Sequence, residues 1–469
     1  MRMKLFLLAC SFIAAAGFST QLESDNIGKK TQWSILPTSL SNTLNKFNQE
    51  KKLKQVTSLI NDDRSTQEEV LKNIYEDWEI DYIYPLIEIM RLSSDAWLIK
   101  NINRILQEKT GVKHKYFFDW LRWLWTQEPA YESYYTDFKG ILYQNIDPKF
   151  KKYFTERNST STIRIDEIVW GGVHQDGIPP LRQPKLLSAQ DADYLNKQDV
   201  VFGVYLNGQA KAYPKRILAW HEFFVDDFDT LTIAGVYCTL CGTVIAYDME
   251  DYDLGTSGFL YRSNKLMYDK ATQSLWNTIE GAPVLGPLAG KGISLATHHV
   301  VTTTWGEWVK QHPDTKVLSL DTGHRRDYGE GVAYQDYFAF DELMFPVPLS
   351  DNRLKNKDEV FIVRIPAYKN DPLAVSINYL QRKKWHQDQI GGTNIILLSD
   401  KAGAARAYEA GDIIFASHKK GKLKDKQGNI WKITENSLSN GSQELKRLPA
   451  HNIFWFAWYN TMPNTRLVK

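Results

Sequence analysis

The sequence predicts an α+β protein in which an N-terminal all-α, HEAT-like helical domain precedes a duplicated, predominantly β domain with short helices. Apolar residues recur at helical spacing between residues 45 and 145. After residue 160, apolar and polar residues alternate along short runs that Gly, Asp and Asn separate. Several short motifs of the middle third then return, in the same order, in the last third. We therefore expect a signal peptide at 1–20, the helical domain at 21–155, a first β-rich unit with a Cys-x-x-Cys site at 156–324, a connector at 325–354, and a second, degenerate unit without cysteines at 355–469.

Length and charge limit the classes of function. A chain of 469 residues can form two or three domains with sizeable cores. The 57 Lys and Arg residues against 55 Asp and Glu give a net charge of +2, so we expect neither nucleic acid nor an anionic membrane as partner. No Gly-rich phosphate loop, Gly-x-Ser-x-Gly elbow or His-Glu-x-x-His motif occurs, and no nucleotide cofactor is expected.

The N-terminus has the three parts of a secretory signal. Basic residues in Met1–Lys4 precede the apolar run Leu5–Phe18, and Ala14–Ala16 provides small residues for cleavage. The run is too short for a comfortable membrane span, so we expect an exported, periplasmic protein. Two alternatives are a lipoprotein that carries its lipid on Cys10 and an uncleaved membrane anchor, and only these would attach the protein to a membrane.

The helical region begins with a capping box. Ser65-Thr-Gln-Glu68 matches that pattern, and Val70, Leu71, Ile74 and Trp78 follow at helical spacing. Further periodic segments and Thr110-Gly111, which closes one of them, continue the series without a strict repeat. This region contains no catalytic constellation, so we expect it to pack against the rest of the chain or to dock a protein partner that the sequence does not identify.

The β-rich region opens with a strong hairpin signal. Val200–Leu206 and Gln209–Tyr213 flank the turn Asn207-Gly208. Farther along, Leu231–Tyr237 leads directly into Cys238-Thr-Leu-Cys241-Gly242, and the alternating run that starts at Val244 leaves it. The two cysteines therefore stand in a turn between two predicted strands.

Four ordered matches predict the duplication. Trp220-His221-Glu222 returns as Trp385-His386-Gln387, Gly242–Asp248 as Gly403–Glu409, Asp269–Trp276 as Asp425–Trp431, and Trp305–Trp308 with Pro313–Thr315 as Trp455–Trp458 with Pro463–Thr465. The offsets fall from 165 to 150 residues without a change of order, as deletions in the later copy would produce.

The two copies serve as controls for each other. At an offset of 161 residues, Cys238 matches Ser399 and Cys241 matches Ala402, whereas a glycine follows in both copies. Because the turn persists without sulfur, function explains Cys238 and Cys241 better than architecture does. Both copies carry a histidine after tryptophan, at His221 and His386, which favours a structural role for His221 over a role as ligand or acid–base group.

The cysteines admit two kinds of chemistry. A strand–turn–strand around Cys-x-x-Cys-Gly is typical of a metal knuckle, whereas a thioredoxin-type pair stands at the start of a helix, for which Val244–Tyr247 is a poor sequence. A metal needs further ligands, and His221, His298, His299 and Met267 are the candidates; copper and zinc both fit. Gly242 rather than His follows the second cysteine, which argues against c-type haem.

Several polar residues follow the knuckle closely in sequence. Ser257, Asn264, Tyr268 and Asp269 could line a pocket beside the cysteines together with Met267, although turns and strand ends also use such residues.

These motifs resemble the bacterial DUF3179 family. The resemblance covers roughly residues 160–469 and rests on Asp176-Gly-Ile-Pro179, Trp220-His221-Glu222, Tyr237–Gly242, Ser257–Asn264, Leu266–Asp269, Trp305–Trp308, His312–Thr315 and Trp455–Trp458. It implies an exported or membrane-associated protein with a Cys-x-x-Cys domain, and it implies no activity. The family often has Pro after the first cysteine, where this chain has Thr239.

Three functions follow as hypotheses. The first is an exported metal-binding protein, a redox or metal-handling factor that holds its metal with Cys238, Cys241 and His221. The second is a periplasmic thiol–disulfide oxidoreductase that uses the two cysteines. The third is a non-enzymatic binding or scaffold module.

Overall fold

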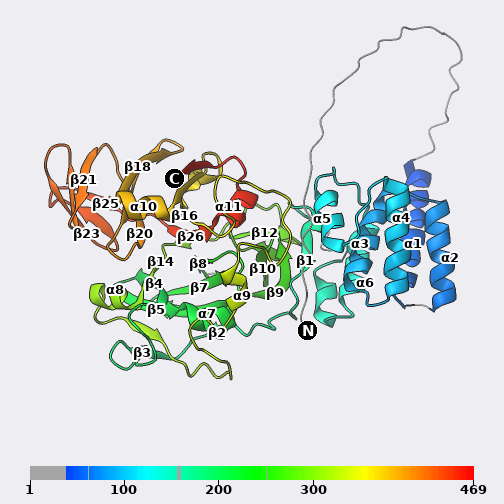
Figure 1. Ribbon diagram of the computed structural model, residues 1–469, viewed down its shortest axis with the longest axis horizontal. Coiled ribbons are helices and arrows are strands. Elements are labelled where there is room, and N and C mark those ends of the chain that lie inside the picture. Colours follow the sequence, from blue (N-terminus) through cyan, green and yellow to red (C-terminus); the bar gives the residue numbers. More distant parts are fainter. Residues whose placement is uncertain (1–37, 62, 156–159, 250) are drawn as a thin grey trace, which may run out of the picture. The chain divides into compact units, whose positions relative to one another are not determined.

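The computed structural model describes residues 38–61, 63–155, 160–249 and 251–469 (Figure 1). The expected signal peptide and Cys10 lie outside the described residues. The chain divides into two compact units, Met1–Phe47 and Asn48–Lys469, so most of the expected helical domain and both expected β units lie in the second. As expected, this unit is helical at first and mainly β-stranded afterwards.

Helices α2–α6 pack together (blue and cyan in Figure 1), and α3 contacts α4, α5 and α6. The helices of this region are α1 Thr38–Asn61, α2 Arg64–Glu76, α3 Ile83–Leu92, α4 Ala96–Thr110, α5 Phe117–Trp125 and α6 Tyr134–Tyr143, with 3₁₀ turns at Ile80–Tyr82 and Pro148–Lys152. Gly111, at φ 75°, ends α4 as expected. The capping-box prediction was wrong by two residues, since Asp63 caps α2 and its carboxylate accepts a hydrogen bond from Thr66 N at 3.1 Å.

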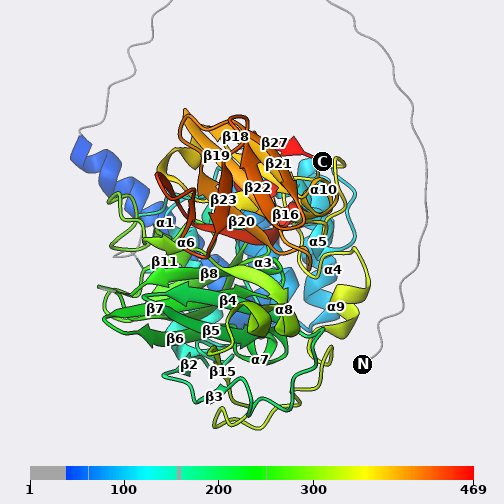
Figure 2. The same cartoon turned by 90° about the vertical axis from the view of Figure 1, so that its left-hand side faces the viewer.

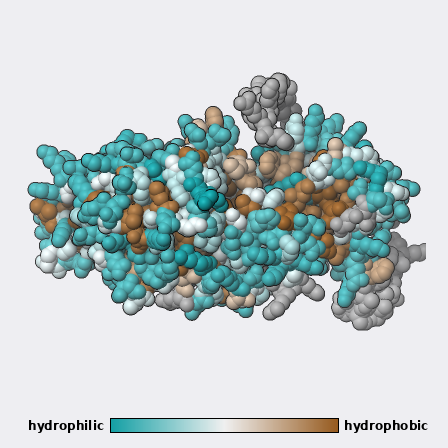
Figure 3. All heavy atoms as spheres, turned by 90° about the horizontal axis from the view of Figure 1, so that it is seen from below, coloured by the Kyte–Doolittle hydropathy of each residue, from teal (hydrophilic) through white to brown (hydrophobic). Residues whose placement is uncertain are grey.

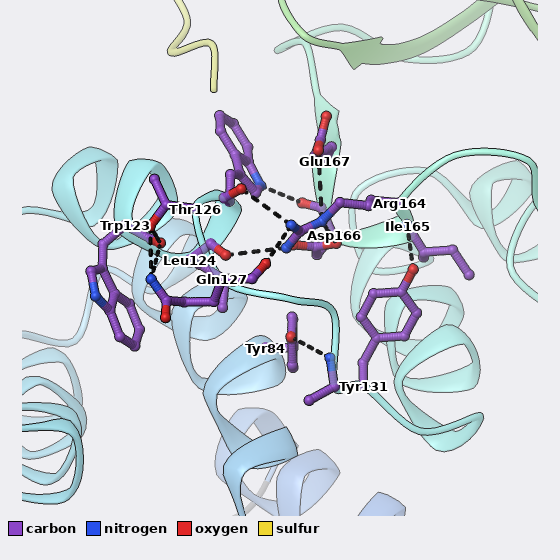
Figure 4. A network of polar contacts seen from close by, with 12 residues as sticks. Tyr84, Trp123, Leu124, Thr126, Gln127, Tyr131, Arg164, Ile165, Asp166 and Glu167 are labelled. Atoms are coloured by element: carbon purple, nitrogen blue, oxygen red, sulfur yellow. Dashed lines mark hydrogen bonds and ion pairs between the residues drawn. The ribbon is translucent and has the colours of Figure 1, made fainter. Parts of the chain in front are cut away.

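A half-buried arginine, Arg164, joins the end of α5 to the start of the β region (Figure 4). Arg164 donates hydrogen bonds to the carbonyl oxygens of Leu124 (3.1 Å), Trp125 (3.2 Å) and Gln127 (2.7 Å). Asp166 accepts two further bonds from the same guanidinium, at 3.1 and 2.7 Å. Carbonyl groups at the C-terminal end of a helix have no partner within the helix, so Arg164 satisfies groups that water would otherwise bind.

The first β region contains three five-stranded sheets, with the orders β1-β9-β10-β11-β12, β13-β8-β7-β6-β2 and β14-β4-β5-β15-β3. Its strands are β1 Ile168–Trp170, β2 Leu181–Arg182, β3 Leu186–Ser188, β4 Val200–Leu206, β5 Gln209–Pro214, β6 Phe223–Phe228, β7 Leu231–Cys238, β8 Thr243–Asp248, β9 Leu254–Tyr261, β10 Asn264–Asp269, β11 Leu275–Asn277, β12 Ala282–Leu285, β13 Thr297–His298, β14 Val301–Thr304 and β15 Lys316–Leu318. Its helices are α7 Lys215–His221 and α8 Trp305–Gln311, with a 3₁₀ turn at Ile165–Glu167. The predicted hairpin at Asn207-Gly208 joins β4 to β5.

The second β region follows the connector, which carries α9 Gln335–Ala339, and its strands lie above those of the first in Figure 2. Its sheets have the orders β26-β16-β17-β27, β18-β19-β20 and β21-β22-β23-β24-β25. The elements are β16 Glu359–Val363, a 3₁₀ turn at Pro366–Lys369, β17 Leu373–Ser376, α10 Ile377–Lys383, β18 Trp385–Ile390, β19 Thr393–Ser399, β20 Ala405–Glu409, β21 Phe415–Lys419, β22 Lys422–Asp425, β23 Ile430–Ile433, β24 Ser437–Ser439, β25 Glu444–Lys446, β26 Ala450–Phe454, α11 Trp455–Thr461 and β27 Arg466–Val468.

Both β regions contain a sheet with the same pairing. Antiparallel β4 and β5 lie between β14 and the parallel strand β15, as β16 and β17 lie between β26 and the parallel strand β27. The indoles match as well. Trp276 and Trp431 donate to Asp269 and Asp425 at 3.1 and 3.0 Å, while Trp308 and Trp458 donate to Thr315 and Thr465 at 2.8 and 2.9 Å.

Strand pairing corrects two of the sequence matches. Trp220 and His221 end α7, whereas Trp385 and His386 begin β18, so the two Trp-His pairs occupy different elements. The Tyr237 amide donates to Glu222 O and the Ser399 amide to Lys384 O, each at 2.9 Å. Ser399 is thus the counterpart of Tyr237, and the residue that corresponds to Cys238 is the next one, Asp400.

The surface in Figure 3 is mainly hydrophilic, with hydrophobic residues in separate patches. Large apolar side chains with more than half of their surface exposed include Phe340 and Ile414. Among residues 38–61, 63–155, 160–249 and 251–469, no helix combines the length and the hydropathy that crossing a bilayer requires.

Candidate functional site

The Cys-x-x-Cys turn connects β7 to β8, as expected. Cys238 is the last residue of β7, and β8 starts at Thr243. The Cys241 amide donates to the Cys238 carbonyl at 3.1 Å, and Gly242 adopts φ 61°, a conformation that glycine accepts without strain. A Cβ at Gly242 would lie 2.6 Å from the ring of Phe454, so the close approach of the second β region also requires glycine.

The two sulfurs touch each other in the interior. Cys238 and Cys241 are free thiols with 1% and 0% of their surface exposed, and their Sγ atoms lie 2.6 Å apart. Two thiolates on one tetrahedral zinc, at about 2.3 Å from the metal, would lie about 3.8 Å apart. Joint coordination of a metal would therefore require the two sulfurs to move apart by about 1.2 Å.

The surroundings distinguish the two thiols. Burial acts to raise the pKa of Cys238, but hydrogen bonds from Cys241 and from the Lys265 amide, together with the Lys265 ammonium, outweigh it and place that pKa below the usual thiol value. Burial and the neighbouring Cys238 raise the pKa of Cys241 well above that value, although Asn264 Nδ2 donates to its sulfur at 3.2 Å. Cys238 is consequently the better nucleophile of the pair.

A buried ion pair lies next to Cys238. Lys265 Nζ donates to the Glu222 carbonyl at 2.7 Å and to the Tyr237 carbonyl at 3.1 Å, and lies 3.3 Å from Glu222 Oε2. Glu222 Oε1 also accepts from Thr239 Oγ1 at 2.8 Å and from Tyr334 OH at 3.2 Å. Glu222 and Lys265 were not among the site residues expected from the sequence. The only sequence signal was that Glu222 follows Trp220-His221 in a motif of the resembling family.

A small cavity of about 70 Å³ reaches Cys238 but not Cys241. Glu222, Lys265 and Phe259 line it from within, and the connector residues Tyr334, Met344 and Phe345 contribute to its wall. The connector is tied to the turn by Tyr337 OH, which donates to Leu240 O at 2.7 Å. A reagent that enters this cavity meets Cys238 first.

His221 is engaged away from the sulfurs. Its Nδ1 lies 2.9 Å from Pro179 O and its Nε2 lies 2.5 Å from Tyr328 OH. Burial is the main reason that the pKa of His221 falls to about 4, so the ring is neutral at pH 7, donates from Nδ1 to the carbonyl and accepts at Nε2 from the tyrosine. Both ring nitrogens are thus used in holding α7 to the segments around Pro179 and Tyr328.

The other expected site residues separate into two groups. Asn264 contacts the cysteines, since its Nδ2 donates to the Cys241 sulfur. The remaining ones bind elsewhere: Ser257 donates to Leu266 O, Tyr268 donates to Asp176, Asp269 accepts from Thr272, Ser274 and Trp276, and Met267 is packed in an apolar cluster with Trp276.

The additional histidines considered as metal ligands are also engaged. His298 binds Asp248, and His299 Nε2 lies 3.1 Å from Tyr205 O. Within the part of the chain that the structure describes, no three side chains of His, Cys, Asp and Glu converge as a metal site would require.

Comparison with known proteins identifies one family. The model of the family described as "Protein of unknown function (DUF3179)" matches residues 175–465, which is more than half of the chain and agrees with the resemblance seen in the sequence motifs. No curated protein matches the chain, and no solved structure matches it either.

Proposed function

Because the chain belongs to the DUF3179 family, whose description assigns no function, the activity has to be inferred from its own residues, and we propose a thiol–disulfide oxidoreductase that uses Cys238 and Cys241. The observation that carries this proposal is the asymmetry of the pair. Cys238 lines the cavity and has the lowered pKa, whereas Cys241 lies behind it in contact with its sulfur and has the raised one. A nucleophilic and a resolving thiol differ in this way.

The reaction is a two-electron exchange. The Cys238 thiolate attacks one sulfur of a substrate disulfide, which forms a mixed disulfide and releases the other substrate sulfur as a thiolate. The Cys241 thiol gives up its proton and attacks the Cys238 sulfur, which releases the second substrate thiolate and leaves a Cys238–Cys241 disulfide. The reverse sequence oxidises a substrate dithiol and restores both protein thiols.

Access to Cys238 involves the connector. Tyr334, Met344 and Phe345 bound the cavity, and Tyr334 donates to Glu222 beside the cysteines. A cavity of about 70 Å³ holds only a few atoms, so a substrate disulfide has to displace part of the connector before it reaches the sulfur. The proposal therefore includes an opening of the segment around Tyr334–Phe345.

Redox titration tests the proposal. The full chain is equilibrated in glutathione buffers of graded potential, and its free thiols are alkylated and counted by mass. We expect Cys238 and Cys241 to be either both modified or both unmodified in each molecule, because the pair forms one two-electron couple, and Cys10→Ser keeps the third cysteine of the chain out of the count. Cys241→Ser should accumulate glutathione on Cys238, and Cys238→Ser should accumulate much less on Cys241. Thiols that stay fully reduced at every potential, in a folded protein, would overturn the proposal.

Metal binding by the same thiolates is the second candidate, favoured by the strand–turn–strand with Gly242 at positive φ. Zinc or copper would bind Cys238 and Cys241, with His221 as the proposed third ligand once its bonds to Pro179 and Tyr328 are broken. Elemental analysis of protein purified under reducing conditions tests this candidate. Stoichiometric metal that Cys238→Ser and His221→Ala both remove would favour it over the oxidoreductase.

We also propose that the chain is exported, that its β unit is duplicated and that its helices have a HEAT-like arrangement. Export of the chain by residues 1–20 would place the thiols in an oxidising compartment, where a disulfide enzyme is useful. Duplication of the β unit is supported by the matched pairing of β4, β5, β14 and β15 with β16, β17, β26 and β27. A HEAT-like arrangement of the helices would offer a docking face for a protein partner, and under the binding-module hypothesis that partner would bind a variant without cysteines equally well.

A further inference from the structure

A second, larger cavity lies where the second β region has its counterpart of the cysteine turn. Asp400, the residue that corresponds to Cys238, lies on its wall, as do Ser399 and Lys401 of the same turn. Its volume is about 770 Å³, within the range of small-molecule sites. Further lining residues include Tyr205 on β4, Lys384 after α10 and Arg406 on β20. Others lie at α8, around the turn between β21 and β22, and at the end of β23.

The two cavities occupy related places. In the first β region, Ser263 and Asn264 at the turn between β9 and β10 contact Cys241, and the cavity beside the cysteines has a volume of only about 70 Å³. In the second, the turn between β21 and β22 faces the turn at Asp400 across an open cavity. The same pairing of strands thus surrounds two sulfurs in one copy and a ligand-sized space in the other.

The polar network in this cavity is built from buried charges. Arg406 lies 2.8 Å from Asp400 Oδ2 and 2.7 Å from Glu435 Oε1, and Arg447 lies 2.9 Å from Glu435 Oε2. Burial acts to raise the pKa of Glu435, but Arg406 and Arg447 outweigh it and hold that pKa well below its usual range. The carboxylates of this network are therefore paired with arginine within the protein.

Positive charge is in excess around the cavity. Five lining residues are Lys or Arg and three are Asp or Glu. Within the described residues, the acids are paired with Arg406, Arg447 and Lys310, while Lys384, Lys401 and Lys420 have no carboxylate partner. His312 Nε2 is buried without a hydrogen bond, 3.6 Å from Glu435 Oε1.

We propose that this cavity binds a small organic anion whose phosphate or carboxylate oxygens contact Lys384, Lys401 and Lys420. The stacked rings of Tyr205 and His312, with centroids 5.3 Å apart, and the side chain of Ile433 form an apolar wall for the rest of the ligand. A phosphate ester and a carboxylic acid share the required anionic oxygens, and binding measurements distinguish them. The site does not depend on the cysteines, so it is independent of the thiol–disulfide proposal.

Calorimetric titration of the full chain at low ionic strength tests the site, with inorganic phosphate and succinate as separate probes. We expect at least one of them to bind with a Kd below about 10 mM, and Lys401→Ala with Lys420→Ala to weaken it by about tenfold or more. Both lysines are exposed, so this double variant should fold. Lys54→Ala with Lys100→Ala removes the same charge from two exposed positions on α1 and α4 and serves as the matched control.

The outcomes separate the sources of the anion. Binding of phosphate but not succinate, lost only in the cavity variant, supports a phosphorylated ligand, and the reverse supports a carboxylic acid. Binding of neither probe overturns the proposal. An equal loss in the cavity variant and in the control pair also overturns it, since the effect would then reflect net charge alone.

Discussion

Lys265 Nζ lies 2.7 Å from the carbonyl oxygen and 3.3 Å from the carboxylate of Glu222, in the interior beside Cys238. The two side chains influence that thiol in opposite directions, because the ammonium lowers the pKa of Cys238 and the carboxylate raises it. The pKa of Cys238 therefore depends on charged side chains outside the Cys-x-x-Cys turn.

Substitution of each charge should shift the titration of Cys238 in opposite directions. Lys265→Met should raise the pKa of Cys238 and Glu222→Gln should lower it, as the pH dependence of alkylation in reduced protein would report. Lys211→Met is the control, because it removes a comparable buried ammonium group, whose Nζ lies 2.8 Å from Asp226. It should leave the pH midpoint of Cys238 alkylation unchanged. Shifts of the same sign in both site variants would contradict this electrostatic assignment.

Lys265→Met should also destabilise the fold by about 3–5 kcal/mol, because Glu222 would remain buried without its counter-charge. Urea denaturation measures the loss. Lys265→Met combined with Glu222→Gln should recover a large part of it, and a double variant that is no more stable than Lys265→Met alone would argue against an ion-pair role.

Gly242→Ala should cost more stability than Gly403→Ala. Both glycines have positive φ, so each substitution carries about 1–2 kcal/mol of backbone strain. At Gly242 the new Cβ would also meet the ring of Phe454 at 2.6 Å, whereas at Gly403 it meets the flexible amide end of Gln381. We expect about 1–3 kcal/mol of additional loss at Gly242, and Gly242→Ala with Phe454→Leu should relieve it. Thermal unfolding of the three variants decides the matter.

Stability should fall as the pH decreases from about 6.5 toward 4, because buried histidines resist protonation. Burial and the nearby Arg364 lower the pKa of His451 to about 3, so below pH 6.5 the unfolded chain takes up a proton that the folded chain refuses. His451→Gln should therefore lose about 2 kcal/mol less than the parent chain between pH 7.5 and pH 5. Urea unfolding of the parent chain and of His451→Gln at the two pH values measures this difference.

Arg164→Met should loosen the attachment of the helical region. The guanidinium is bonded to three carbonyl oxygens at and just after the end of α5 and to the buried Asp166, so its removal should cost about 1–3 kcal/mol, mainly because the Asp166 carboxylate loses two hydrogen bonds and its counter-charge. Hydrogen exchange should accelerate in α5 and around Ile165. Arg122→Met, which removes an exposed ion pair with Asp119 on the same helix, should change stability by less than about 1 kcal/mol.

Local patterns accounted for much of the fold. The Asn207-Gly208 hairpin, the end of α4 at Gly111 and the turn between β7 and β8 all follow from nearby residues, because a turn glycine and alternating side chains act over a few positions. The family was evident from the motifs themselves, whereas the duplication predicted from their order stays a prediction.

The register of the strands and the neighbours of the site residues could not be derived from nearby residues in the same way. The match of Trp220-His221 with Trp385-His386 was displaced by three residues. An isolated Trp-His pair does not show whether it will end a helix, as in α7, or begin a strand, as in β18. The alignment of Cys238 with Ser399 was displaced by one residue. The turn between β19 and β20 is shorter than the turn between β7 and β8, and the motifs alone do not show where the residue is missing.

By itself, then, the sequence determined that two cysteines stand in a glycine-ended turn between strands, in a chain of the DUF3179 family. Only the tertiary structure decided that Glu222, Lys265 and Asn264 surround those cysteines, that His221 is bound to Pro179 and Tyr328, and that the corresponding turn at Asp400 opens on a cavity. The physical reason is that these neighbours come from separate strands and helices, and they meet only when long-range hydrogen bonding has set the register of the sheets.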